Sequence, residues 1–461
     1  MNFSDIKNIH FVGIGGIGMS GIAEVLANAG VAVSGCDLKR SAATDMLENH
    51  GIDVKFGHDA SHITPDVELV VTTAAVRGQN PEVDAAIARG IRVMRRSEAL
   101  GAIVNEKRAV GVAGTHGKTT TSSMVSMLLE DAGLDPTVLV GGIVRNLGTN
   151  AKTGRGEFLV VEADEYDRTF HQLHPEVAVV TNIEADHLEY YGTFEAILEA
   201  FEIYLRGVKP GGAVIGCIDD PHVASLLEHC RKQFASDLSH RRRVIGYGFS
   251  EKADVRAVGV TYNERGASFE VPAVGYFKLF VPGEHNVLNA LAAIAVGSQL
   301  GIETGTLRSA LARFLGVERR FQILGEARGI TIVDDYAHHP TEIRATLNGA
   351  RRGYPSRRIV ALFQPHLFSR TSEFAREFGE ALAIADVALV SPVFAAREQP
   401  IAGVTSQLIA DAVPSVEYVE GSNVEIAKAL SSRLQAGDLF IAMGAGDVHE
   451  IAEWLVEEDQ R

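Results

Sequence analysis

The stretch Gly111-Val-Ala-Gly-Thr-His-Gly-Lys-Thr-Thr-Thr121 decides the fold, because it places a glycine-rich turn between a buried strand and a helix. Residues 107–113 are apolar enough for a strand, and residues 119–132 carry apolar side chains at helical spacing. Such a turn exposes backbone N–H groups that can hold phosphate oxygens. The sequence therefore predicts a phosphate-binding loop, in which Lys118 reaches the terminal phosphates and the Thr119 hydroxyl binds Mg²⁺.

The loop departs from the pattern G-x-x-x-x-G-K-[ST] at one position, since Val112 stands where the first glycine is expected. The core Gly114-Thr-His-Gly-Lys-Thr119 is retained, and Thr120 follows it. The alternative interpretation is a structural glycine turn with a surface lysine. The context of strand, loop and helix favours the phosphate site.

A second glycine-rich turn lies near the N-terminus, where Gly13-Ile-Gly-Gly-Ile-Gly18 follows an apolar strand at residues 9–12. A helix over residues 19–29 and a strand over residues 31–35 complete a βαβ unit, and Asp37 follows. This fingerprint fits a nicotinamide dinucleotide, but the pyrophosphate of a sugar nucleotide such as UDP fits it as well. The motif alone does not decide between these two ligands, and it is also compatible with a purely structural turn.

Carboxylates and an imidazole follow two strands after the phosphate loop. The hydrophobic strand 158–162 ends in Glu162, and the strand 177–182 leads to His187. Ligands collect at the carboxyl ends of parallel strands, so Glu162 and His187 are expected to share a metal site with Thr119. One histidine among oxygen donors suits Mg²⁺ or Mn²⁺ better than zinc.

Three further acids in these segments are expected to be solvated loop residues, namely Glu165, Asp167 and Glu184. At Pro282-Gly-Glu-His-Asn286 a helix is expected to begin, and Asn289 lies one turn further on. The polar side chains at this helix start are either an elaborate cap or ligand contacts, and the sequence does not separate the two.

The length of 461 residues predicts about three domains. The formal net charge of −16 argues against nucleic acid as a partner. Three scattered cysteines form no C-x-x-C pair, so they indicate neither a disulfide framework nor a zinc site, and they are expected to be reduced and buried. No signal peptide or long apolar run is present, so we expect a cytoplasmic protein without membrane insertion.

Alternation of strands and helices predicts open, mostly parallel sheets at both ends of the chain. Polar breaks at residues 101–107 and 316–322 are the expected linkers, and residues 237–279 are expected to be rich in strands. The predicted domains are therefore 1–104, 105–320 and 321–461. In the third domain, strands beginning at Ile330, Ile359, Val387 and Asp438 end in polar groups.

Seven segments together carry a resemblance to a known family, and it covers nearly the whole chain. They are His10-Phe-Val-Gly-Ile-Gly-Gly-Ile-Gly-Met-Ser-Gly21, Gly114-Thr-His-Gly-Lys-Thr119, Glu162-Ala-Asp-Glu165, Thr181-Asn-Ile-Glu-Ala-Asp-His187, Gly283-Glu-His-Asn286, Asp334-Asp-Tyr-Ala-His-His-Pro-Thr-Glu342 and Gln364-Pro-His366. In this order they resemble the Mur ligase family. The resemblance implies a Rossmann-like N-terminal domain, a central P-loop ATP-binding domain and a Rossmann-like C-terminal domain.

The resemblance also implies a reaction. ATP would activate the lactyl carboxylate of UDP-N-acetylmuramic acid as an acyl phosphate, which the amine of L-alanine would attack, as a step of peptidoglycan precursor synthesis. The UDP-sugar would be bound by Gly15, Gly16, Ile17, Gly18, Asp37 and Thr73. ATP would be bound by Gly114, Thr115, His116, Gly117, Lys118, Thr119 and Thr120.

Further roles follow from the same resemblance. Asn289 would contact adenine, Asp335 the ribose and Arg320 the phosphates. Thr119 and Glu162 would hold one Mg²⁺, and His187 a second, with Mn²⁺ as a substitute. The alanine pocket would be lined by Tyr336, His338 and Arg370. The candidate general base is His338, with an ordinary pKa, or a nearby acid. The expected catalytic set is Lys118, Glu162, His187, His338 and Arg370.

Two departures from the family pattern concern the metals and the alanine pocket. Residues 188–208 contain no lysine that could be carbamylated to bridge the metals, so Glu199 or Glu202 is the candidate bridge. Leu367 stands where some members carry a basic residue, which leaves Arg370 as the anchor for the amino acid's carboxylate.

Other functions stay open at this stage. A related ligase would add a different amino acid or a preformed peptide to the same UDP-sugar. A dehydrogenase would bind NADH but would need no phosphate loop, and a regulatory module would bind ATP without amino-acid-dependent turnover. A monomer or a homodimer is expected.

Overall fold

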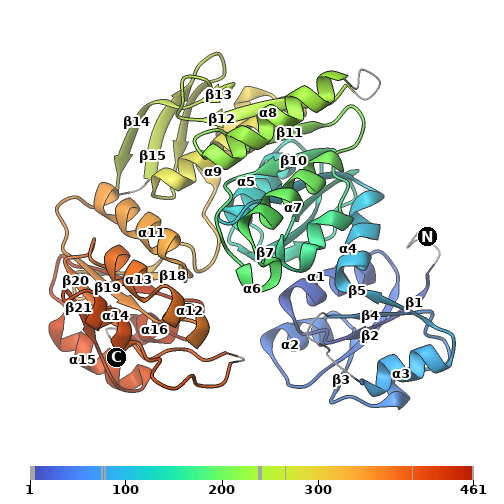
Figure 1. Ribbon diagram of the computed structural model, residues 1–461, viewed down its shortest axis with the longest axis horizontal. Helices are drawn as coiled ribbons and strands as arrows, with labels where there is room; N and C mark the ends of the chain where they lie inside the picture. The colour runs from blue at the N-terminus through green and yellow to red at the C-terminus, as the bar shows by residue number, and fades with distance from the viewer. Residues whose placement is uncertain are drawn as a thin grey trace. The chain divides into compact units, whose positions relative to one another are not determined.

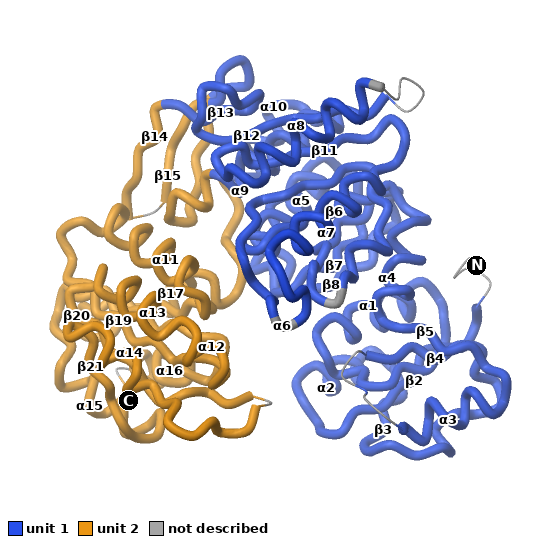
Figure 2. The backbone as a smooth tube through the Cα atoms, in the orientation of Figure 1, with its two compact units in different colours: residues 1–258, 271–275, 288–311 blue, residues 259–270, 276–287, 312–461 orange. Residues whose placement is uncertain are grey.

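The computed structural model describes residues 6–73, 76, 79–236, 241–264, 266–396 and 398–458, and it is an α/β protein with N-terminal, central and C-terminal domains (Figure 1). Contacts divide the chain into two compact units (Figure 2). The first unit comprises residues 1–258, 271–275 and 288–311, and the second comprises residues 259–270, 276–287 and 312–461.

The N-terminal domain is built on a five-stranded parallel sheet in the order β3-β2-β1-β4-β5, as expected from its βαβ pattern. Its strands are β1 (Asn8–Val12), β2 (Ala32–Asp37), β3 (Asp53–Phe56), β4 (Leu69–Thr72) and β5 (Arg92–Arg95). Its helices are α1 (Ile17–Asn28), α2 (Ala42–Asn49), the 3₁₀ helix η2 (Ala60–His62), α3 (Pro81–Ala88) and α4 (Arg96–Asn105). Strand β4 ends at Thr72, and Ala74 and Ala75 lie outside the described residues.

The prediction of a linker at residues 101–107 is wrong, because residues 101–105 form the end of helix α4. Leu100, Ile103 and Val104 are buried, so one side of this helix is apolar. Gly101 lets the helix approach its neighbours, since a Cβ there would lie 2.7 Å from the backbone oxygen of Gln172. A glycine that reads as a break in the sequence is therefore a packing requirement inside a helix.

The central domain carries an eight-stranded sheet in the order β13-β12-β11-β10-β6-β9-β7-β8, parallel except for the β7–β8 pair. Its strands are β6 (Arg108–Ala113), β7 (Thr137–Val144), β8 (Thr149–Lys152), β9 (Phe158–Glu162), β10 (Val177–Val180), β11 (Ala213–Cys217), β12 (Arg243–Gly248) and β13 (Val255–Arg256). The helices are α5 (Lys118–Asp131), η3 (Tyr166–Gln172), α6 (Leu188–Tyr191), α7 (Phe194–Arg206), α8 (Pro221–Ser236), α9 (Glu284–Gln299) and α10 (Thr304–Arg313). Strand β6 thus lies between β9 and β10.

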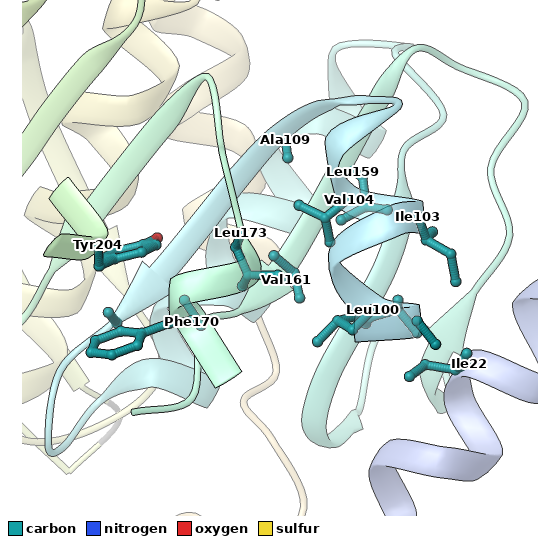
Figure 3. Close-up of a cluster of buried hydrophobic side chains, with 14 of the residues drawn as sticks. Ile22, Leu100, Ile103, Val104, Ala109, Leu159, Val161, Phe170, Leu173 and Tyr204 are labelled. Atoms are coloured by element: carbon teal, nitrogen blue, oxygen red, sulfur yellow. The ribbon is translucent and has the colours of Figure 1, made fainter. Parts of the chain in front are cut away.

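One buried cluster joins the sheet to its covering helices (Figure 3). Leu100 and Val104 of α4 lie near Val161 of β9, and Phe170 of η3 stacks on Tyr204 of α7 with ring centroids 5.1 Å apart. Burial of each such side chain contributes about 1.5–3 kcal/mol. The strand that ends in Glu162 is therefore held in place by packing against this buried apolar cluster.

The expected strand-rich segment at residues 237–279 is present, but its strands belong to two sheets. Strands β12 and β13 extend the central sheet, whereas β14 (Val258–Asn263), β15 (Gly266–Val271) and β16 (Gly275–Leu279) form a separate three-stranded sheet. Most of the smaller sheet belongs to the second unit.

The C-terminal domain has a six-stranded sheet in the order β17-β18-β22-β19-β20-β21, in which only β17 is antiparallel. The strands are β17 (Gln322–Ala327), β18 (Ile330–Asp335), β19 (Ile359–Phe363), β20 (Val387–Val390), β21 (Val416–Tyr418) and β22 (Leu439–Met443). The helices are α11 (Pro340–Gly353), α12 (Phe368–Glu373), α13 (Ala375–Leu382), α14 (Gln407–Ala412), α15 (Asn423–Arg433) and α16 (His449–Glu458). The four expected strands are confirmed, and the short edge strands β17 and β21 were missed.

Two sequence-based expectations about the whole chain can be compared with the structure. Cys36, Cys217 and Cys230 are unpaired and buried, as expected. Within the described residues, none of the helices combines the length and the apolar character that crossing a bilayer requires.

Candidate functional site

The phosphate loop is fixed to the end of strand β10 by several hydrogen bonds. The amide of Thr115 donates to the backbone oxygen of Asn182 (3.0 Å), and the amide of His116 donates to Asn182 Oδ1 (2.8 Å). Thr181 Oγ1 donates to the oxygen of His116 at 2.5 Å. Gly114 and Gly117 have φ of +132° and +84°, which favours glycine at both positions. These hydrogen bonds and the two glycines therefore hold the loop in its shape.

The missing first glycine of the loop pattern has a physical explanation. Val112 is fully buried within strand β6 and pairs with Glu162 of β9. The turn begins only at Gly114, so position 112 needs a strand former that fills the core. The structure confirms the strand, loop and helix predicted around Lys118.

Lys118 forms a buried ion pair that the sequence analysis missed. Its Nζ lies 2.9 Å from each carboxylate oxygen of Glu165 and donates to the oxygens of Gly114 (2.6 Å) and Thr115 (3.2 Å). Burial opposes the charge of Lys118, but the carboxylates of Glu165 and Asp164 outweigh it and raise the lysine's pKa. Glu165 is only 4% exposed, so the expectation of a solvated loop acid at this position is wrong.

Asn289 reaches the phosphate loop from helix α9, about 170 residues further along the chain. Its Oδ1 accepts a hydrogen bond from Thr121 Oγ1 (3.0 Å), and a Cβ on Gly117 would lie 2.7 Å from the same oxygen. Asn286, by contrast, donates from Nδ2 to the backbone oxygen of Pro282, just before the helix begins. The contact of Asn289 with adenine stays a prediction.

Two of the expected metal ligands come from the segments that flank the loop: Glu162 is the last residue of strand β9, and His187 lies beyond the end of strand β10. Strand β6 leads into the loop between β9, which ends in Glu162, and β10, whose continuation carries His187. The Glu162 carboxylate occupies the space that a side chain at Gly141 would need. Carboxylate, hydroxyl and one imidazole at this sheet edge fit Mg²⁺ or Mn²⁺.

The other candidate metal ligands and loop acids of the central domain each have neighbours of their own. His187 has φ of +56°, and its ring packs edge-on against Tyr166 with centroids 5.1 Å apart. Glu184 is partly buried, and its Oε2 lies 3.5 Å from His116 Nε2. The expectation of a freely solvated acid at this position is therefore wrong. Glu202, a candidate metal bridge, pairs with His229 at 3.0 Å on helices α7 and α8. The side chain of Asp167 lies outside the described residues.

The N-terminal glycine turn is held by the strand that follows it. The amides of Gly13 and Ile14 both donate to the backbone oxygen of Cys36 at 2.9 Å, and the amide of Gly15 donates to Asp37 Oδ2 at 2.9 Å. Gly13 has φ of +80°, and Thr73 lies beside it, 2.8 Å from the position of a Cβ. Asp37 thus shapes the turn, besides its expected contact with the nucleoside.

A cavity of about 300 Å³ connects this turn to the central domain within the first unit. It is lined by Gly16, Ile17, Gly18 and Thr73 from the N-terminal domain and by Glu162 and Asp164 from the central domain. The structure therefore brings four expected substrate-binding residues and one expected metal ligand to the same space.

Arg96 also lines this cavity, and the sequence analysis missed it. Its Nη1 would lie 2.9 Å from a Cβ on Gly18, and its Nη2 lies 3.3 Å from Thr169 Oγ1 and 3.9 Å from Asp164 Oδ2. Arg96 directly follows strand β5, at the carboxyl edge of the sheet, where ligands bind in open α/β folds. A cation at this position was the signal in the sequence that could have identified it as a site residue.

The other expected site residues form a second group in the second unit. The guanidinium groups of Arg319 and Arg320 each lie 5.2 Å from the ring centre of Tyr336. Arg320 Nη1 lies 3.4 Å from Glu342, a residue to which the sequence analysis gave no role. Asp335 accepts hydrogen bonds from the amides of Phe321 and Ala337, both at 2.8 Å, and burial raises its pKa to about 6.

His338 lies in the same group. Its Nδ1 is 3.2 Å from Glu342 and 3.0 Å from the oxygen of Tyr336. Burial lowers the pKa of His338 to about 4. The Glu342 carboxylate acts in the opposite direction and raises this pKa, whereas the positive charge of Arg370 on helix α12 lowers it further. The expectation of an ordinary pKa for this histidine is wrong, because burial disfavours its cationic form.

Three α/β domains, a phosphate loop flanked by a carboxylate and a histidine, and a second glycine turn define an ATP-dependent ligase that forms an amide bond. Family profiles agree with this class: "Mur ligase family, catalytic domain" matches residues 8–108, "Mur ligase middle domain" residues 112–297 and "Mur ligase, glutamate ligase domain" residues 319–446. The chain belongs to the Mur ligase family.

Individual relatives narrow the comparison. The UDP-N-acetylmuramate--L-alanine ligase of Geobacter sulfurreducens is 44% identical over 460 residues, which cover 98% of this chain and 97% of that protein. The enzyme of the same name from Salinibacter ruber is 45% identical, covering 98% and 95%. Among solved structures, UDP-N-acetylmuramate-alanine ligase from Thermotoga maritima is 31% identical with a TM-score of 0.81, covering 98% of this chain and 99% of that one.

Proposed function

We propose that this chain joins L-alanine to the lactyl carboxylate of UDP-N-acetylmuramic acid at the expense of ATP, in peptidoglycan precursor biosynthesis. The observation that carries the proposal is the cavity shared by the glycine turn at Gly16–Gly18 and the carboxylate of Glu162. A diphosphate held at the turn would extend its sugar towards the strand edge that carries the phosphate loop. The names of the relatives given above support the same substrates.

The phosphate loop would bind ATP and orient its γ-phosphate. Backbone amides of the loop and Lys118 would bind the phosphate oxygens, and Mg²⁺ or Mn²⁺ would be held by Thr119, Glu162 and His187. The metal, when bound, lowers the electrostatic repulsion between the anionic reactants. Lys118 would have to exchange its contact with Glu165 for the phosphates, so nucleotide binding is coupled to the breaking of an ion pair.

The chemistry requires an activated carboxylate. The γ-phosphoryl group of ATP passes to the lactyl carboxylate, which releases ADP and gives an acyl phosphate. The free amine of L-alanine attacks the acyl carbon, and phosphate leaves as the amide forms. Exclusion of water is needed throughout, because water would hydrolyse the acyl phosphate.

The second unit would supply the amino-acid pocket. Arg370 would bind the carboxylate of alanine, and Tyr336 and His338 would line the pocket. Because the pKa of His338 is lowered to about 4, the imidazole is neutral near pH 7 and can accept a proton, although it is a weak base. The adjacent carboxylate of Glu342 would stabilise the protonated imidazole during the transfer.

A related ligase that adds another amino acid or a preformed peptide is the second candidate. A solved murein peptide ligase from Psychrobacter arcticus is 26% identical to this chain, with a TM-score of 0.69 and coverage of 98% of both chains. We place either reaction in the cytoplasm, which the unpaired state of the three cysteines supports.

Phosphate release tests the proposal and separates the two candidates. The full-length protein would be incubated with ATP, Mg²⁺ and UDP-N-acetylmuramic acid, and with L-alanine, glycine, L-serine or a murein tripeptide in parallel. We expect release that depends on L-alanine and on the UDP-sugar. Release that depends on the tripeptide instead would favour the second candidate, and release independent of both would contradict ligase activity.

A further inference from the structure

Four side chains of the N-terminal domain converge on one buried carboxylate. Glu82, at the start of helix α3, is 0% exposed. Its Oε2 lies 3.0 Å from Cys36 Sγ and 2.8 Å from His58 Nδ1, and its Oε1 lies 2.6 Å from His62 Nδ1 and 3.8 Å from His10 Nε2. None of these residues belongs to the phosphate loop or to the expected alanine pocket.

His10 provides the second observation. It is 1% exposed, its Nδ1 lies 2.9 Å from Ser34 Oγ, and its Nε2 has no hydrogen-bond partner. A buried nitrogen left without a partner costs about 1–3 kcal/mol. Ser34 fixes the ring so that the unpartnered nitrogen points at Glu82 and Cys36.

These donors have the chemistry of a transition-metal site. His10 Nε2, Cys36 Sγ and a Glu82 carboxylate oxygen all lie within 4.8 Å of one another. Around a tetrahedral zinc ion, with bonds of about 2.0–2.3 Å, neighbouring donor atoms are separated by roughly 3.3–3.8 Å. Small adjustments therefore give zinc geometry: the 3.0 Å separation of Cys36 Sγ and Glu82 Oε2 opens slightly, and the longer separations close.

The surroundings of the three donors fit the same interpretation. Metal-binding histidines commonly hydrogen-bond through their other ring nitrogen, and metal-binding carboxylates accept further hydrogen bonds that orient them. Ser34 contacts His10 in this way, and His58 and His62 contact Glu82. His58 Nδ1 is also 3.3 Å from Cys36 Sγ, so it is placed to supply a fourth donor.

We propose that His10, Cys36 and Glu82 bind a zinc-class divalent ion, with His58 at or beside the fourth position. In the metal-free protein the Cys36 thiol keeps its proton, which it donates to Glu82. On binding, the thiol loses this proton to solvent and the thiolate bonds to the ion, so that one proton is released per ion.

Charge in the cluster agrees with binding of a cation. Burial alone would raise the pKa of Glu82, but the histidines and the thiol around it outweigh burial and lower the pKa to about 2. Burial and the neighbouring carboxylate raise the pKa of Cys36. The metal-free site therefore holds one buried negative charge and a second group that becomes an anion only when a cation arrives.

The site lies directly beneath the glycine turn. The backbone oxygen of Cys36 accepts the amides of Gly13 and Ile14, and Asp37, the next residue, holds Gly15. An ion bound to Cys36 would thus fix the strand end that shapes the turn. The ion would stabilise the diphosphate site without contacting the substrate.

Cobalt substitution tests the proposal. The full-length protein would be treated with a chelator, dialysed and titrated with Co²⁺, because a cobalt–thiolate bond gives an intense near-ultraviolet charge-transfer band that oxygen and nitrogen ligands do not give. We expect one sulfur-ligated ion per chain, displaced by one equivalent of Zn²⁺ with a rise in Tm. Co²⁺ bound at Glu162 and His187 would not contribute to this band.

Variants then assign the band to Cys36. Cys36→Ser should abolish it, and Cys217→Ser, which removes another buried cysteine, should leave it unchanged. Should Cys36→Ser fail to fold, Ser34→Ala provides a milder change that should weaken Zn²⁺ binding by about 10-fold or more. Absence of the band in the wild-type protein, or its survival in Cys36→Ser, would overturn the proposal and leave a purely hydrogen-bonded cluster.

Discussion

The amino group of Lys118 lies 2.9 Å from both carboxylate oxygens of Glu165, and it also donates to the backbone oxygens of Gly114 and Thr115 in the phosphate loop. Glu165 is held in turn by its backbone oxygen, which accepts a hydrogen bond from Tyr191 Oη at 2.5 Å. The lysine would therefore have to leave a partner of the same charge as the nucleotide before it could bind the phosphates of ATP.

Glu165→Gln should tighten nucleotide binding. The amide is close to the carboxylate in shape but carries no charge, so ATP no longer competes with an anion for Lys118. We expect the Kd of ATP, measured by calorimetry, to fall by about 10-fold. Glu157→Gln, which changes an exposed glutamate near Arg108, is the matched control. Weaker ATP binding in Glu165→Gln would show that Glu165 orients the lysine rather than competing for it.

Lys118→Ala should abolish turnover and also destabilise the protein. The substitution leaves the Glu165 carboxylate buried without its cation, which costs about 3–5 kcal/mol when one partner of a buried pair is removed. Lys118→Met combined with Glu165→Gln should recover most of the stability but no activity. Phosphate release and chemical denaturation measure the two effects, and turnover in either variant would contradict the role of the loop.

Gly117→Ala should impair ATP binding with little effect on the overall fold. Gly117 has φ of +84°, and an added Cβ would lie 2.7 Å from Asn289 Oδ1, so the loop has to shift. Gly133→Ala is the control, since Gly133 has φ of +72° but nothing within 4 Å of the added atom. Both variants carry backbone strain, but only the first is expected to raise the KM for ATP, by about 10-fold or more. Equal effects would mean that Asn289 does not hold the loop.

Local elements around the phosphate loop could be predicted from the sequence because each carries its own periodicity. The strand and helix around Lys118 and the strand that ends in Glu162 match the structure, apart from small shifts at their ends. The short strands β17 and β21 were missed because edge strands of three to six residues leave little pattern. The helix at residues 101–105 was missed because Gly101 reads as a break.

Contacts between distant residues could not be predicted in the same way. Asn289 touches Gly117 and Thr121 across about 170 residues, and nothing local in the sequence indicates this. Glu165 was taken for a solvated acid because a loop acid and a buried ion-pair partner look alike in a sequence. The resemblance to a family supplied the substrate. The structure added Arg96 and Glu165 to the candidate site of the first unit and Glu342 to the group in the second unit.

Stability should fall as the pH is lowered from about 6.5 towards 4, and His338 should contribute to the loss. Its folded-state pKa is lowered to about 4, so below pH 6.5 the unfolded chain takes up a proton that the folded chain does not. A histidine with this shift contributes about 3 kcal/mol across that interval. His338→Gln should flatten the decline in Tm between pH 7 and 5, and exposed His229→Gln should not. An unchanged slope in His338→Gln would show that the imidazole is not buried as described.

Arg96→Met should weaken binding of the UDP-sugar and leave ATP binding unchanged. The Arg96 guanidinium lies against Gly18 in the cavity that also contains Glu162, where it can donate to an anionic group of the substrate. A lost charge-assisted hydrogen bond is worth about 1.5–3 kcal/mol, so the KM for UDP-N-acetylmuramic acid should rise by roughly 10- to 100-fold. Arg92→Met, on an exposed position of strand β5, is the matched control. A rise in the KM for ATP instead would mean that Arg96 serves the nucleotide rather than the sugar.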